Sequence, residues 1–169
     1  MNRIKNIIPY NTLLSLYYTT IYTHLCYCIS IWGNACETTL SKIFILQKRI
    51  VRIMTHSNYL ARTSPLFCQI CLLKVEDIYK FHVLQFMYKC QIRCLPLNCL
   101  NLIRVCTVHS HNTRHIPYFE LISAKSTLRQ KSISYFGPRL WDSLPGSLQS
   151  QTLLSNLKKS LTLLLISKY

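Results

Sequence analysis

The chain has 169 residues, half of them hydrophobic, which is enough for one folded domain with a buried core, or for one domain with an appendage. It carries 20 Lys and Arg against 5 Asp and Glu, a formal net charge of +15. Such an excess indicates a polyanionic partner, either the phosphates of a nucleic acid or an anionic membrane surface.

The scarcity of acidic residues excludes the common carboxylate chemistries. The complete set is Glu37, Glu76, Asp77, Glu120 and Asp142. Polymerases and nucleases that use two metal ions need clustered carboxylates, and the adjacent pair Glu76 and Asp77 would point about 100° apart on a helix. The sequence contains no Asp-Asp pair of the polymerase type and no recognisable glycosidase pair or Ser/His/Asp triad. We therefore expect that this chain alone is not an enzyme.

The first element along the chain is an uncharged, aromatic segment at residues 6–36. It lacks Lys, Arg, Asp and Glu, but Asn, Ser, Thr and His are frequent in it. That polarity is high for a membrane-spanning helix of about 20 residues. We predict a buried helix from about Asn11 to Ile31, and a small membrane-associated protein that uses residues 6–36 is an alternative. Gly33 and Asn34 are expected to break the chain after this helix, because both tolerate the left-handed conformation.

A basic amphipathic helix is predicted at residues 40–54. One face of the helical wheel is apolar and consists of Ile43, Leu46, Ile50, Ile53 and Met54. The other face is cationic and consists of Lys42, Lys48, Arg49 and Arg52. Few acids are near enough in the sequence to neutralise these cations, so the face is a candidate for phosphate contacts. A solvated helix face without a partner is the alternative.

Two further helices are expected after a loop at residues 55–63. Pro65 marks the start of the first, because proline fits the first turn of a helix, where its missing N–H costs nothing. The acidic pair at residues 76–77 opens the second, and Lys89 and Arg93 close it. This order of charges is the one that the helix dipole favours.

The helical periodicity then fades in residues 96–116, which are predicted to be irregular. Short alternating patterns at Tyr118 to Ser123 and at Lys131 to Phe136 allow two short strands, and hence a short β-hairpin. The sequence thus predicts a C-terminal extension that is less regular than the N-terminal half.

Near the C-terminus, Gly137 and Pro138 predict a turn, and a short helix after it is expected to place Trp141 in the core. Trp32 is also expected in the core rather than stacked on nucleic-acid bases. Regularly spaced leucines predict a last amphipathic helix over residues 153–167.

A histidine-rich loop is the second candidate site. His109, His111 and His115 have a spacing that could suit a metal ion, but no carboxylate or recognisable zinc scaffold accompanies them. A polar loop in which Arg114 contacts phosphate or sugar fits better, and an inert loop fits equally well. Arg114 is therefore a candidate nucleic-acid-binding residue.

The chain has nine cysteines, an odd number, and lacks the pattern of a secretory leader, so we expect free thiols in a reducing, intracellular compartment, the nucleus or the cytoplasm. Cys68, Cys71, Cys90 and Cys94 approximate the spacing of a four-thiolate zinc site. Their apolar surroundings favour buried thiols, because true zinc ligands usually stand in glycine-containing polar turns. We expect no cofactor.

Several short patterns, in a fixed order, resemble the region that follows the palm in reverse transcriptases of LINE-type, jockey-like non-LTR retrotransposons. Those in the N-terminal half are Leu14, Tyr17, Tyr27, Ile31-Trp32-Gly33, Leu40, Leu46-Gln47-Lys48-Arg49 and Arg52-Ile53. Those farther along are Ser64-Pro65-Leu66-Phe67, Leu73-Lys74-Val75, Asp77-Ile78-Tyr79, Phe86 to Lys89, Leu95-Pro96, His111-Asn112-Thr113-Arg114 and Gly137 to Pro145. The family usually has other residues where this chain has Asp142 and Leu157.

The resemblance implies a helical, thumb-like domain at residues 1–95, an irregular connector at residues 96–130 and a C-terminal extension at residues 131–169. The fold class expected is therefore mainly α. A thumb of this kind grips the backbone of an RNA–DNA template-primer, while the palm of the parent RNA-directed DNA polymerase performs the chemistry. A degenerate transposon remnant without a selected function is a further alternative.

Overall fold

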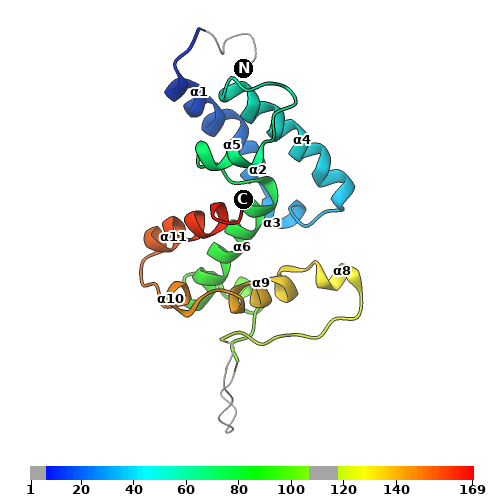
Figure 1. Cartoon of the computed structure of the whole chain (residues 1–169). Coiled ribbons are helices and arrows are strands. Elements are labelled where there is room, and N and C mark those ends of the chain that lie inside the picture. Colours follow the sequence, from blue (N-terminus) through cyan, green and yellow to red (C-terminus); the bar gives the residue numbers. More distant parts are fainter. Residues whose placement is uncertain (1–6, 107–117) are drawn as a thin grey trace. The chain divides into compact units, whose positions relative to one another are not determined.

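The computed structural model describes residues 7–106 and 118–169, and these residues are mainly helical, as the sequence predicts (Figure 1). The N-terminal elements are α1 (Tyr10–Leu16), the π-helical η1 (Tyr17–Tyr22), α2 (Thr23–Cys26), α3 (Ile29–Trp32), α4 (Glu37–Met54) and α5 (Ser64–Gln69). The later elements are α6 (Val75–Gln91), α7 (Leu97–Leu100), α8 (Thr127–Gln130), α9 (Ile133–Asp142), α10 (Gly146–Gln149) and α11 (Leu154–Ile166).

The chain forms two compact units. The first comprises Met1–Tyr79 and Leu161–Tyr169, and the second comprises Lys80–Ser160. The long helices α6 and α11 each contribute residues to both units. The divisions expected after residues 95 and 130 stay predictions.

The first unit begins with a broken helix rather than the continuous one expected from Asn11 to Ile31. The chain widens into the π-helical η1 and then breaks between α2 and α3, where Tyr27 is extended and Cys28 has φ 49°. Trp32 is half-buried and its indole N–H donates to the Tyr27 carbonyl oxygen at 2.7 Å. The break thus gains a hydrogen bond across it.

Gly33 follows α3, as expected, but for a different physical reason. Its φ is −65°, a value open to any residue, so no left-handed conformation is involved. A Cβ atom built on Gly33 would lie 2.5 Å from the Ile29 carbonyl oxygen and 2.5 Å from Cδ2 of Tyr79. Glycine is required here because the backbone approaches α6 too closely for any side chain.

The core of the first unit joins aromatic and aliphatic side chains from α4, α5 and the N-terminal helices. Its buried members are Tyr17, Val51, Met54, Phe67, Ile70 and Leu72. The terminal residue packs against this core: the Tyr169 ring lies 6.3 Å from the Phe67 ring, and its hydroxyl accepts a 2.9 Å hydrogen bond from the Lys74 backbone N–H. Pro65 stands in the first turn of α5, which confirms the predicted helix start.

The second unit is built around the buried face of α6. The first turn of α6 contains Glu76 and Asp77 and its last turn contains Lys89, as the charge order predicts. Gly137 of α9 faces Met87, whose Sδ would lie 2.7 Å from a Cβ added at Gly137. Trp141, also on α9, is 1% exposed, and its ring lies edge-on to Phe119 at 6.3 Å. The prediction that Trp141 lies in the core is confirmed.

The short strands expected near the C-terminus are wrong. Residues Ile133–Asp142 form the helix α9. The apolar–polar alternation at residues 131–136 is too short to distinguish a strand from a helix. Of the described residues, only Val105 and Phe119 pair in β fashion, as an isolated antiparallel bridge. The predicted turn at Gly137 and Pro138 is also wrong, because both residues lie inside α9. The terminal helix α11 is confirmed.

Candidate nucleic-acid interface

The helix α4 carries the candidate site, and its buried face differs from the expected one. Its buried residues are Gln47, Val51 and Met54. Leu46, which the helical wheel placed inside, is 55% exposed, and of the predicted apolar face only Met54 is fully buried. Compared with the face that the helical wheel predicts, the buried face of α4 is thus rotated about the helix axis, so that the polar residue Gln47 points inward.

The side chain of Gln47 explains this rotation, because its amide is bonded to three distant groups. Its Nε2 donates to the Tyr17 hydroxyl at 3.1 Å and to the Leu73 carbonyl oxygen at 2.8 Å. Its Oε1 accepts from the Val75 N–H at 3.1 Å, the first N–H of α6. Burial raises the pKa of the Tyr17 hydroxyl to about 12, so it stays protonated at neutral pH. These bonds fix the rotation of α4 in the first unit.

An α-helix turns by about 100° per residue, so Lys42, Arg49 and Arg52 lie on the side of α4 away from Gln47. Lys48, the residue after Gln47, lies at the edge of that side. Lys42 and Arg49 are exposed. Lys48 is half-buried, and its Nζ lies 4.1 Å from the centre of the Phe44 ring, so part of its interaction energy is already used within the protein. The cations freest to meet a phosphate are therefore Lys42 and Arg49.

Arg52 has a structural task as well. Its Nε donates to the Ala61 carbonyl oxygen at 3.0 Å, and its guanidinium lies 5.9 Å from the centre of the Tyr59 ring. The guanidinium carries five N–H donors in a planar fork, and this hydrogen bond uses one of them. Arg52 thus holds the loop of residues 55–63 against α4 and keeps donors for an anion.

Sequence reasoning did not single out Tyr59, which the structure places beside this cationic face. Tyr59 is 67% exposed and lies on the loop that Arg52 anchors. An exposed tyrosine next to arginine suits stacking on a sugar or base. Tyr59 has no periodic signal in the sequence, because loop residues follow no helical pattern.

The electrostatics of α4 are one-sided. Its single carboxylate, Glu37, stands in the first turn, and the four cations follow it toward the C-terminus. Glu37 lies at the positive, N-terminal end of the helix dipole and Arg52 at the negative, C-terminal end, and both positions are stabilising. The outer face therefore presents positive charge along more than two turns, an arrangement that can bind a row of phosphates.

The second predicted site cannot be placed. Arg114 and the histidine-rich loop, with His109, His111 and His115, lie outside the described residues. The prediction that Arg114 contacts nucleic acid therefore stays a prediction.

The cysteines show no metal centre in the described part of the chain, where no group of three or more His, Cys, Asp or Glu could hold an ion. Of the four residues with zinc-like spacing, only Cys90 is buried; Cys68 is half-buried, and Cys71 and Cys94 are exposed. The expectation that these thiols are buried is thus right for Cys90 alone. Burial, with a smaller contribution from the nearby Cys99, raises the pKa of the Cys90 thiol to about 11.

The alternative of a membrane-associated protein depends on the uncharged segment at residues 6–36. No helix among residues 7–106 and 118–169 has the length and apolarity to cross a bilayer. In this segment the longest regular α-helix is α1, with seven residues.

Comparisons with protein-family models, with curated proteins and with solved structures gave no match. The site is therefore interpreted from its own geometry and charge.

Proposed function

We propose that the chain binds the sugar-phosphate backbone of a nucleic acid through the outer face of α4. The observation that carries this proposal is the position of Lys42, Arg49 and Arg52 on the side of α4 opposite the buried Gln47, with Lys48 at its edge and a single carboxylate on the same helix. The resemblance to LINE-type reverse transcriptases supports an RNA–DNA template-primer as the ligand. The chain then acts as the non-catalytic thumb side of an RNA-directed DNA polymerase.

The mechanism is electrostatic positioning. Each Lys or Arg that contacts a phosphate releases condensed counterions, which gives salt-dependent affinity without sequence preference. The Gln47 hydrogen bonds fix the orientation of α4, so that its cations meet the backbone in one register. Phosphoryl transfer needs clustered carboxylates and is assigned to a palm domain of the parent polymerase.

The test is a salt titration of binding to a labelled RNA–DNA primer-template. Lys42→Ala/Arg49→Ala is the best variant, because both side chains are exposed and neither is held within the protein by a cation–π contact or the loop anchor. Two lost phosphate contacts should reduce the slope of log K against log salt by roughly 1.8, at about 0.9 per contact. Affinity at low salt should fall with it.

The matched control is Lys125→Ala/Arg129→Ala, which removes the same two residue types from exposed positions of the second unit. It should leave the slope nearly unchanged. If both variants lose affinity equally, binding follows net charge alone, as expected of a degenerate remnant. If neither variant changes binding, α4 is a solvated face and the proposal fails.

A further inference from the structure

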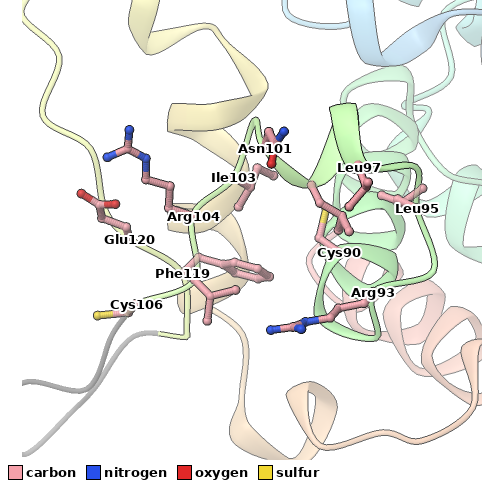
Figure 2. A pocket seen from close by; sticks show the side chains of 12 residues that line it. Cys90, Arg93, Leu95, Leu97, Asn101, Ile103, Arg104, Cys106, Phe119 and Glu120 are labelled. Atoms are coloured by element: carbon pink, nitrogen blue, oxygen red, sulfur yellow. The ribbon is translucent and has the colours of Figure 1, made fainter.

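The second unit contains a large hollow that the proposed nucleic-acid contacts do not use. Its volume is about 1070 Å³, at the upper end of the range for small-molecule sites. The hollow lies between the end of α6, the helix α7 and the bridged segments around residues 105 and 119 (Figure 2). It is therefore lined by residues of a single unit and is open to solvent on one side.

Part of the wall of the hollow is apolar, on the side of the segment that follows α6 and of α7. Apolar side chains that line it include Leu95, Leu97, Leu100, Ile103 and Phe119. Ile103 and Phe119 are 5% and 2% exposed and belong to the core, whereas Leu97 is 76% exposed, so the free apolar surface is on the leucine side. The hollow thus offers apolar surface that a ligand could cover.

The bridge between Val105 and Phe119 directs the neighbouring side chains to opposite sides of the two segments. Arg104 and Glu120, which also line the hollow, oppose each other beside the isolated bridge, where the Glu120 N–H donates to the Arg104 carbonyl oxygen at 2.9 Å. Side chains alternate between the two sides of such paired segments. Figure 2 shows Arg104 and Glu120 extending from one side and Phe119 from the other. The carboxylate of Glu120 is therefore directed away from Phe119.

Arg93 supplies a positive charge at the hollow. It follows α6, and its guanidinium extends from the helix end toward the side on which Phe119 lies (Figure 2). The backbone of Arg93 has φ 51°, a conformation that favours glycine. The Cys90 thiol in the same wall stays protonated at neutral pH, because burial raises its pKa, and so adds no negative charge.

We propose that this hollow binds a fatty-acid-like amphiphile, with the alkyl chain against Leu95, Leu97 and Leu100 and the carboxylate on Arg93. The apolar wall provides the burial that an alkyl chain needs. The guanidinium forms charge-assisted hydrogen bonds with a carboxylate. This site lies apart from α4 in the sequence and is independent of the nucleic-acid proposal.

Calorimetric titration of the full chain with dodecanoate, below its micelle concentration, tests the proposal. We expect one site per chain, no binding of acetate and weaker binding of dodecanol. Arg93→Gly removes the guanidinium and places glycine where the backbone favours it, so this variant should fold. It should weaken dodecanoate binding about tenfold or more, and leave dodecanol binding unchanged.

Three controls separate this site from general attraction to a basic protein. His56→Gly makes the same kind of backbone change at a left-handed position of the first unit, and should bind dodecanoate like the parent. Lys159→Ala removes one exposed charge from the second unit, and should also bind normally. Leu97→Asp places a carboxylate at the hollow and should weaken binding as strongly as Arg93→Gly.

The proposal is overturned if Arg93→Gly binds dodecanoate as tightly as the parent. It is also overturned if several molecules bind per chain and Lys159→Ala reduces their affinity equally, since binding would then follow net charge. Binding of acetate with the same affinity would show that the apolar wall plays no part.

Discussion

Replacement of Gln47 by leucine tests whether its hydrogen bonds hold the first unit together. Leucine has a similar size but no polar atoms, so the Val75 N–H, the Leu73 carbonyl and the Tyr17 hydroxyl lose their partner. Val75 and Leu73 are 1% and 7% exposed, so their backbone groups have little access to water. Each buried polar group left unsatisfied costs about 1–3 kcal/mol. We therefore expect Gln47→Leu to lower the free energy of unfolding by about 3 kcal/mol or more.

Urea unfolding followed by tryptophan fluorescence measures this change. Trp32 lies in the first unit and Trp141 in the second, so a Trp141→Phe background in both proteins makes the signal report the first unit. The midpoint should fall by at least about 1 M. Gln69→Leu, at an exposed position of α5, is the control and should change stability by less than about 0.5 kcal/mol.

The reasoning is refuted if Gln47→Leu costs less than about 1 kcal/mol, since the three bonds would then contribute little net stability. Tyr17→Phe adds an internal check, because it removes one of the three bonds and should cost about 1 kcal/mol. In a double-mutant cycle the two changes should be non-additive, because they share a hydrogen bond.

Two other predictions concern stability. The Nε2 atom of His82 is buried and has no hydrogen-bond partner among the described residues, and burial lowers its pKa, with smaller effects from Lys158 and Lys89. The unfolded chain therefore binds the proton more readily, so the free energy of unfolding is highest above the unfolded pKa of about 6.5 and falls as the pH drops below it. When urea unfolding is measured between pH 7.5 and 5, His82→Leu should reduce this pH dependence. An unchanged pH dependence would contradict the assignment to His82. Gly33→Ala should lower the free energy of unfolding by about 1–3 kcal/mol, because the added Cβ meets a backbone oxygen. Gly137→Ala should lower it much less, because the added Cβ meets a methionine side chain that can move aside. Equal losses of stability in thermal unfolding would show that these contacts do not decide the cost.

The sequence was sufficient for the elements whose signals are local. The start of α5 at Pro65 and the order of charges along α6 follow from residues within one or two helical turns. The existence of α4 also follows from its periodicity. Such signals depend on residues close together in the sequence, so they predict a helix end without knowledge of the tertiary contacts.

The rotation of α4 could not be predicted in this way. A polar residue is assigned to the outside by any helical wheel, and Gln47 is inside only because Tyr17, Leu73 and Val75 present matching groups. The break at Cys28 was equally hidden, since neither glycine nor proline marks it. The candidate cations were found because lysine and arginine seldom lie in a core, but the loop anchor at Arg52 depends on a contact across nine residues.

The π-helical turn of η1 has a consequence for tolerance of length changes. A π-helix bonds each N–H one residue farther back than an α-helix, so a wide turn accommodates one residue more than a regular turn. Loss of a single residue within Tyr17–Tyr22 would tighten the turn to α-helical geometry and leave the flanking segments facing the same way. A single-residue gap in an alignment with a related chain is therefore best placed in this segment, where the wide turn can accommodate it, rather than in α4.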